Sequence, residues 1–152
     1  MKALPRKRNR FALTPDNTFA REREDCGMST GLISVIDDDE SVRRATSRLL
    51  KSMGFDVGVF SSAQEFLLSA RLRDTSCLIL DLRMPDMDGL ELQSYLTAQG
   101  HQIPIIFHAV CLDDAIRTQA LRGGAIAFLQ KPTTEQELLD AILLALNLGD
   151  RV

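Results

Sequence analysis

The sequence predicts an α/β fold with one parallel sheet that is covered by helices on both faces. Short apolar runs alternate five times with longer segments whose apolar residues recur at helical spacing. These runs are mainly apolar along their whole length, as expected of strands that are buried on both faces. Consecutive parallel strands are joined by right-handed helical crossovers. The predicted architecture is therefore a doubly wound (βα)5 parallel sheet.

The expected strands are short and rich in β-branched and aromatic residues, and turn or capping residues bound each of them. They cover residues 32–36, 55–60, 77–80, 103–108 and 125–129. The run at 77–80 is apolar to its last residue and is followed at once by Asp81. This abrupt change from apolar to charged is the first indication of a functional site.

The helical segments carry their own start and stop signals. Gly54, Gly100 and Gly123 are expected in the C′ position after the first, third and fourth helices. Capping-box spacing joins Ser62 to Glu65, Asp88 to Glu91 and Thr134 to Glu137. The expected apolar faces comprise Val42, Ala45, Leu49, Leu50 and Met53 in the first helix, and Leu138, Leu139, Ile142, Leu143 and Leu146 in the last.

Charge divides the chain into two parts. Residues 1–27 hold seven Lys/Arg and four Asp/Glu, a net charge of +3, so the total of −3 leaves −6 for the remainder. We expect residues 1–30 to form a disordered basic extension, residues 31–148 one folded domain, and residues 149–152 a tail. Because Met28 resembles a natural start, the extension is interpreted as an upstream addition without function rather than an arm that binds an acidic surface.

Composition excludes several classes of protein. No apolar run approaches the roughly 18 residues of a membrane span, and the basic head lacks the apolar region of a secretory signal. The three cysteines are odd in number and lack C-x-x-C spacing, which disfavours a disulfide framework or a zinc site. The acidic body disfavours nucleic-acid binding. We expect a cytoplasmic protein that contacts neither membrane nor nucleic acid.

Charged residues follow three of the expected strands. Asp37 and Asp38 come after the first strand, Asp81 after the third and Lys131 after the fifth. In open α/β sheets, ligands bind beyond the carboxyl ends of the strands, where strand order reverses. A single aspartate in such a place is usually a turn or capping residue, and Asp39 and Asp88 are interpreted as caps. The four charges together predict a site.

The chemistry of this set favours magnesium. Two carboxylates about 4 Å apart repel each other by roughly 4 kcal/mol at an effective dielectric constant near 20. A divalent cation and Lys131 would supply the missing positive charge. Mg²⁺ prefers a few carboxylates, keeps several waters and accepts a phosphoryl oxygen. The sequence therefore predicts a Mg²⁺ site that receives a phosphoryl group.

Four segments resemble the receiver domain of two-component response regulators: "VIDDDESVRR", "LILDLRMPDMDGLEL", "IPII" and "GGAIAFLQKP". Their order and spacing are those of the family over roughly residues 31–148, and receivers of nitrogen-fixation-type regulators are the most similar. The resemblance implies a flavodoxin-like fold with strand order 2-1-3-4-5. It also implies a phosphoprotein of a phosphorelay that signals by protein–protein contact and is not a conventional enzyme.

The resemblance assigns a role to each site residue. Asp81 would accept a phosphoryl group from a sensor histidine kinase or a phosphotransfer protein. Asp38, Asp81 and the backbone carbonyl of Arg83 would bind Mg²⁺, and Asp37 would act on the metal through water. Lys131 would contact the phosphoryl oxygens, and its bond to Pro132 is often cis in the family.

One position departs from the family pattern. Ala109 stands five residues after Pro104, where the family carries the Thr or Ser whose hydroxyl binds the phosphoryl group. The lost hydrogen bond is worth roughly 1.5 to 3 kcal/mol. Phe128 holds the position of the switch aromatic that follows this hydroxyl. His108 replaces an apolar residue, and we expect a core histidine whose nitrogens are satisfied by backbone rather than a group that bonds near the site.

Several alternatives stay open. A pseudo-receiver that takes no phosphate would act as a binding module, which the substitution at Ala109 favours. The chain is either a stand-alone receiver or a truncated part of a DNA-binding regulator. A phosphatase of the haloacid-dehalogenase type would use Asp37-x-Asp39, but such enzymes place a lysine before a late acidic pair, whereas Asp113 and Asp114 precede Lys131 here.

Overall fold

The computed structural model describes residues 31–110 and 113–150, with the side chains of 148–150 excepted. Five parallel strands form one sheet in the order β2-β1-β3-β4-β5, which confirms the predicted fold class and strand order. The strands are β1 (Leu32–Ile36), β2 (Asp56–Phe60), β3 (Thr75–Leu80), β4 (Ile105–Ala109) and β5 (Ala127–Gln130). The helices are α1 (Glu40–Ser52), α2 (Ala63–Leu67), the 3-10 turn η1 (Ala70–Leu72), α3 (Gly89–Ala98), α4 (Asp114–Arg122) and α5 (Glu135–Asp150).

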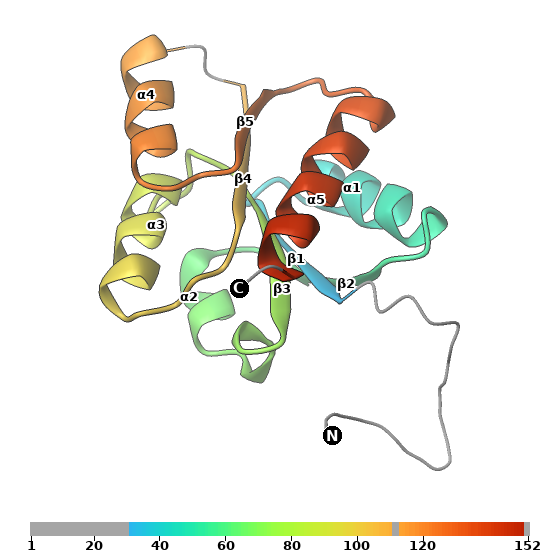
Figure 1. Cartoon of the computed structure of the whole chain (residues 1–152), viewed down its shortest axis with the longest axis horizontal. Helices are drawn as coiled ribbons and strands as arrows, with labels where there is room; N and C mark the ends of the chain where they lie inside the picture. The colour runs from blue at the N-terminus through green and yellow to red at the C-terminus, as the bar shows by residue number, and fades with distance from the viewer. Residues whose placement is uncertain (1–30, 111–112, 151–152) are drawn as a thin grey trace. The chain divides into compact units, whose positions relative to one another are not determined.

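The helices form two layers around the sheet, with α2, α3 and α4 on one face and α1 and α5 on the other (Figure 1). Alternate strand residues enter the two cores, because successive side chains of a strand point to opposite faces. Ile36, Leu80 and Phe107 pack under α2, α3 and α4. Ile79 and Ile106 pack under α1 and α5. The central strands are thus buried on both sides, as their continuous apolar runs predicted.

The register of the strands aligns their carboxyl ends. Ile36 at the end of β1 pairs with Phe60 of β2 and with Leu80 of β3. Leu80 pairs in turn with Phe107 of β4. The residues that follow Ile36 and Leu80 are therefore neighbours at one edge of the sheet.

Most predicted helix ends are confirmed. Asp88 and Glu91 form a reciprocal capping box, with both N–H···O distances at 2.9 Å. Thr134 and Glu137 do the same at 3.0 and 3.1 Å. Asp39 caps α1 by accepting hydrogen bonds from the backbone N–H groups of the first turn. Gly54 and Gly100 have the positive φ expected after a helix.

Two predicted helix ends were wrong in detail. Glu65 accepts from the backbone N–H of Ser61 rather than from that of Ser62, although Ser62 caps Glu65 as expected. Gly123 closes α4 with a φ of −77°, and Gly124 takes the left-handed conformation instead, because the helix runs one residue further than predicted.

Two apolar faces also differ from the prediction. In α1 the predicted core residue Ala45 is exposed, and Thr46 is buried instead. In α5 Leu143 is 51% exposed, and Ala141 and Ala145 fill the core beside Leu138 and Ile142. Small residues suffice there because α5 lies close to the sheet.

Some sequence predictions fall outside the described residues. The basic extension at 1–30 and the last two residues of the tail are among them. In the described part of the chain, no helix combines the length and the apolar character needed to cross a bilayer.

Candidate functional site

The predicted site residues meet at the carboxyl edge of the sheet. Asp37 directly follows β1, Asp81 follows β3 and Lys131 follows β5. Backbone hydrogen bonds extend the pairing by one residue at each of these places: Asp81 N–H donates to Ile36 O at 2.9 Å, and Lys131 N–H donates to Ala109 O at 2.8 Å. The sheet itself thus fixes where the charged side chains begin.

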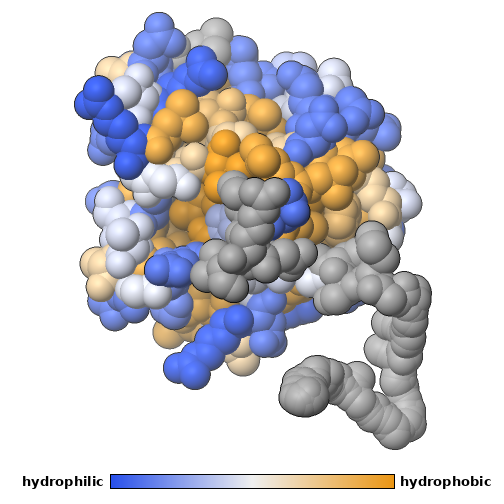
Figure 2. Space-filling view, in the orientation of Figure 1, coloured by the Kyte–Doolittle hydropathy of each residue, from blue (hydrophilic) through white to orange (hydrophobic). Residues whose placement is uncertain are grey.

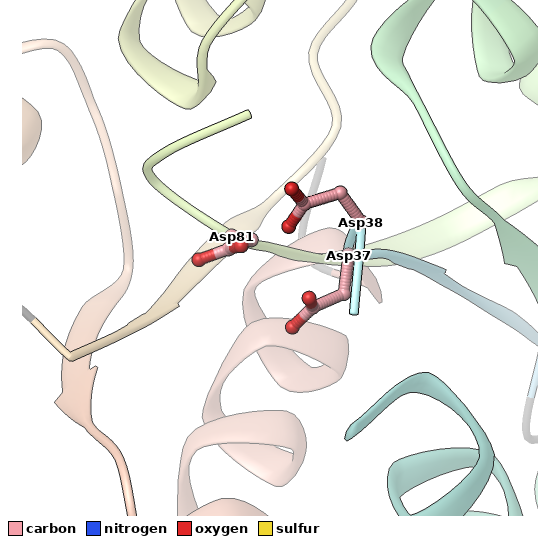
Figure 3. Close-up of side chains that lie close together, drawn as sticks. All are labelled: Asp37, Asp38 and Asp81. Carbon is pink, nitrogen blue, oxygen red and sulfur yellow. The ribbon is translucent and has the colours of Figure 1, made fainter. Parts of the chain in front are cut away.

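Three carboxylates share one small space. Asp37, Asp38 and Asp81 each offer an oxygen, and these oxygens all lie within 4.8 Å of one another. Figure 3 shows Asp37 and Asp38 at the end of β1 and Asp81 at the end of β3. Asp37 and Asp81 are buried, at 2% and 8% exposure, whereas Asp38 is exposed. The site is therefore a pocket whose floor is buried and whose rim is open to water.

Lys131 supplies a positive charge to this pocket. Its Nζ donates a hydrogen bond to Asp37 Oδ2 at 2.7 Å and lies 3.6 Å from Asp81 Oδ1. Its side chain is only 14% exposed. The Lys131–Pro132 peptide bond is cis, as the resemblance implied. One ammonium faces three carboxylates, so the pocket holds an excess of negative charge.

The excess charge affects the pKa of Asp81. Burial, reinforced by the carboxylates of Asp37 and Asp38, raises the pKa of Asp81 from 3.8 to about 6. Lys131 lowers the same pKa, but does not offset the other causes. A divalent cation bound by the three carboxylates would favour the ionised form, because an adjacent positive charge stabilises a carboxylate. The donors are the hard oxygens that Mg²⁺ prefers.

The loop after Asp81 packs closely against it. Gly89 donates its backbone N–H to Leu82 O at 2.8 Å. A Cβ on Gly89 would lie 2.6 Å from the Asp81 carbonyl oxygen and 2.9 Å from the Phe107 ring. Arg83, whose carbonyl is a predicted metal ligand, is exposed in this loop. The loop conformation therefore requires glycine at position 89 for space.

Asp39 and Asp113, which were weighed for a haloacid-dehalogenase site, have other partners. The carboxylate of Asp39 accepts hydrogen bonds from the backbone N–H groups of Ser41 and Val42. Asp39 is thus engaged as the cap that the sequence analysis expected. Asp113 likewise caps α4.

The end of β4 contains the departure noted in the sequence. Ala109 is buried and brings no hydroxyl to the site. Phe128 pairs with Phe107 across β4 and β5, and the two rings stack with centroids 5.9 Å apart and planes at 29°. Phe128, which the resemblance assigns as the switch aromatic, thus lies against the core in this structure.

His108 corrects a sequence prediction. It is 8% exposed, and its Nε2 has no hydrogen-bond partner among residues 31–110 and 113–150. The expectation that backbone satisfies this histidine was wrong for that nitrogen. Burial and the Lys131 ammonium lower the pKa of His108 to about 4, against the opposing effect of Asp37. The ring is therefore neutral at pH 7 and lies near the site charges.

Known proteins share this fold and this pattern. The model of the response regulator receiver domain family matches residues 33–143. Response regulator protein TodT of Pseudomonas putida is 45% identical over 78% of this chain and 52% of its own length. Nodulation protein W of Bradyrhizobium diazoefficiens is 43% identical over 75% of this chain and 50% of its own. The chain spans about half the length of these relatives.

Solved structures agree. Response regulator StyR superimposes with a TM-score of 0.74 at 46% identity, over 79% of this chain and 61% of that one. The crystal structure of FixJ-N gives a TM-score of 0.72 at 34% identity, over 79% of this chain and 96% of that one. With its strand order, its acidic pocket and these matches, the chain belongs to the family of response regulator receiver domains.

Proposed function

We propose that this receiver accepts a phosphoryl group on Asp81 from a sensor histidine kinase or a phosphotransfer protein. The observation that carries the proposal is the position of Asp81 between two further carboxylates and the Lys131 ammonium. Receiver domains in general are phosphorylated on an aspartate in the presence of Mg²⁺, and this pocket has the donors that the reaction needs.

The carboxylates of Asp38 and Asp81, with the Arg83 carbonyl, would hold the Mg²⁺ ion, and Asp37 would act on the ion through water. Bound there, the ion would neutralise charge on the transferring phosphoryl group. Asp81 attacks the phosphorus as a carboxylate, so its proton must be absent, and the bond from phosphorus to the donor's histidine nitrogen breaks as the new oxygen–phosphorus bond forms. Lys131 turns from Asp37 toward the phosphoryl oxygens and stabilises their negative charge. Both side chains start from strand ends, which limits their freedom before the reaction.

The output step is weakened in this proposal. Ala109 offers no hydroxyl to the phosphoryl group, so phosphorylation gains no hydrogen bond at the end of β4. Phe128 already stacks on Phe107, and no group at Ala109 links its position to the pocket. We infer that Asp81 is phosphorylated while the coupled rearrangement of α4 and β5 is reduced or follows another route. The pseudo-receiver is the second candidate, and the same substitution favours it.

Signalling by protein–protein contact is part of the proposal. Figure 2 shows apolar side chains gathered over the face where α4, β5 and α5 lie. The large apolar residues exposed on and beside these elements are Val110, Leu121, Leu143 and Leu144. Relatives of this chain include transcriptional regulators such as FixJ of Bradyrhizobium diazoefficiens. A partner, in the cytoplasm, would read the phosphorylated state from this face.

Intact mass spectrometry tests phosphorylation directly. The protein is incubated with acetyl phosphate and Mg²⁺, beside an Asp81→Asn variant and a sample in EDTA. We expect one phosphoryl adduct that is absent from both controls. A folded wild-type protein without any adduct would contradict the proposal and favour the pseudo-receiver.

An Ala109→Thr variant tests the switching step. Restoring the hydroxyl should enlarge the phosphorylation-dependent chemical-shift changes of α4 and β5 and lengthen the lifetime of the adduct. Ala109→Val is the matched control, because it adds similar volume without a hydroxyl. Equal changes in both variants would contradict the assigned role of position 109.

A further inference from the structure

A buried nitrogen of His108 is unused by the site as described so far. Nε2 is enclosed and has no hydrogen-bond partner within the residues that the structure describes. A buried polar atom without a partner costs stability, so such atoms are rare in folded proteins unless they serve another state. His108 directly precedes Ala109, at the strand end that borders the pocket.

The strand pattern places His108 on the same face of the sheet as the site charges. Ile79, Ile106 and Leu129 all belong to the core under α1 and α5. Continuing the alternation by two residues in each strand puts Asp81, His108 and Lys131 on that face. The pairing of Leu80 with Phe107 makes Asp81 and His108 the next neighbours in register.

Lys131 must pass over β4 to reach its carboxylates. It starts at the end of β5, and the sheet order places β4 between β5 and the two acidic strand ends. Its Nζ is now held by Asp37, which lies beyond Asp81 in this direction. A turn of the ammonium from Asp37 toward a phosphoryl group on Asp81 therefore brings it back toward β4, where His108 lies.

We infer that His108 is a positioning residue whose Nε2 accepts a hydrogen bond from the Lys131 ammonium when Lys131 turns toward the phosphoryl group. The inference rests on the proposed function. An ammonium carries three donors, and the 2.7 Å bond to Asp37 uses one of them. A neutral imidazole offers an acceptor nitrogen. Burial first, and then the Lys131 ammonium, lower the pKa of His108 against the opposing effect of Asp37, which agrees with an unprotonated ring near a cation.

The kinetic test compares His108→Leu with His108→Gln. Leu removes the acceptor, and we expect adduct formation from acetyl phosphate and Mg²⁺ to slow about tenfold, the lower range for one hydrogen bond to a charged group. Gln offers a side-chain carbonyl acceptor and should recover most of the rate. His101→Gln is the matched control, because His101 precedes β4 at its opposite end, and it should keep the wild-type rate.

Stability separates this role from a structural one. His108→Leu replaces with an apolar group a buried nitrogen that has no partner among the described residues, so its urea midpoint should equal or exceed that of the wild type. A slower reaction in a protein that is at least as stable supports the inference. A His108→Leu variant that reacts at the wild-type rate overturns the inference. A His108→Leu variant that is both slower and less stable also overturns it when His108→Gln does not recover the rate.

Imidazole ¹⁵N NMR gives an independent readout, because the chain has only two histidines. Beryllofluoride with Mg²⁺ serves as a stable phosphoryl mimic. We expect Nε2 of His108 to shift upfield, as an accepting nitrogen does, with His101 unchanged, and Lys131→Met should abolish the shift. If the His108 signal does not move while acetyl phosphate still modifies Asp81, the inference about His108 is overturned and the proposed function stands. Absence of the adduct from wild type overturns the proposed function and this inference together.

Discussion

Replacing Asp81 with Asn should stabilise the folded protein above pH 6 when Mg²⁺ is absent. Burial and two neighbouring carboxylates raise the pKa of Asp81 from 3.8 to about 6. A group whose folded-state pKa is raised favours folding most below its unfolded pKa, and this contribution is lost as the pH rises through the folded pKa. The ionised Asp81 therefore costs stability at neutral pH, and Asn removes that cost.

The magnitude follows from the size of the shift. A change of about two pKa units, at about 1.36 kcal/mol each, sets an upper limit of about 3 kcal/mol at pH 8. Water reaches the rim of the pocket and screens part of the repulsion, since the side chain of Asp81 is 11% exposed. We therefore expect a gain of about 1 to 3 kcal/mol for Asp81→Asn at pH 8.

Urea unfolding in EDTA at pH 8 and pH 4 measures this effect. The advantage of Asp81→Asn should be present at pH 8 and fall to about 0.5 kcal/mol at pH 4, where Asp81 is protonated in the folded protein and only partly ionised in the unfolded chain. Asp56→Asn is the control, because Asp56 is exposed at the start of β2 and its variant should stay within about 0.5 kcal/mol of wild type. Equal stability of wild type and Asp81→Asn at pH 8, or a difference that persists undiminished at pH 4, would refute the electrostatic reasoning.

Three further predictions concern the same pocket. Mg²⁺ should raise the urea midpoint of the wild type, and Asp38→Asn should lower the apparent Mg²⁺ affinity measured from this rise by about tenfold. The capping variant Asp88→Asn should leave that affinity unchanged. Lys131→Met should raise the pKa of Asp81 above about 6, because Lys131 lowers it; a ¹³C NMR titration of the Asp81 carboxyl in EDTA that shows a lower value would contradict this. Gly89→Ala should cost about 1 to 3 kcal/mol in urea unfolding, since its Cβ would meet the Asp81 carbonyl at 2.6 Å; unchanged stability would show that the loop yields freely.

Local patterns predicted the elements of the fold because each pattern has a local physical cause. Mainly apolar runs mark strands with two covered faces: β1 has the expected bounds, whereas β3 begins two residues earlier and β4 two residues later than expected. Capping boxes depend on residues three positions apart, so Asp88 with Glu91 and Thr134 with Glu137 were readable from the chain. The predictions for Ala45 and Leu143 were wrong because residue spacing identifies the apolar side of a helix only approximately. The neighbouring elements decide which residues at the border of that side are buried.

The sequence by itself determined the parallel sheet and placed Asp37, Asp38, Asp81 and Lys131 at strand ends, because parallel strands present their carboxyl ends at one edge. Only the tertiary structure decided how these charges pair. The 2.7 Å contact between Lys131 and Asp37 joins residues 94 positions apart, and the space that Gly89 leaves depends on Phe107 from another strand. The burial of His108 Nε2 and its lack of a partner among residues 31–110 and 113–150 are likewise products of packing, since both arise only when β3, β4 and β5 lie side by side.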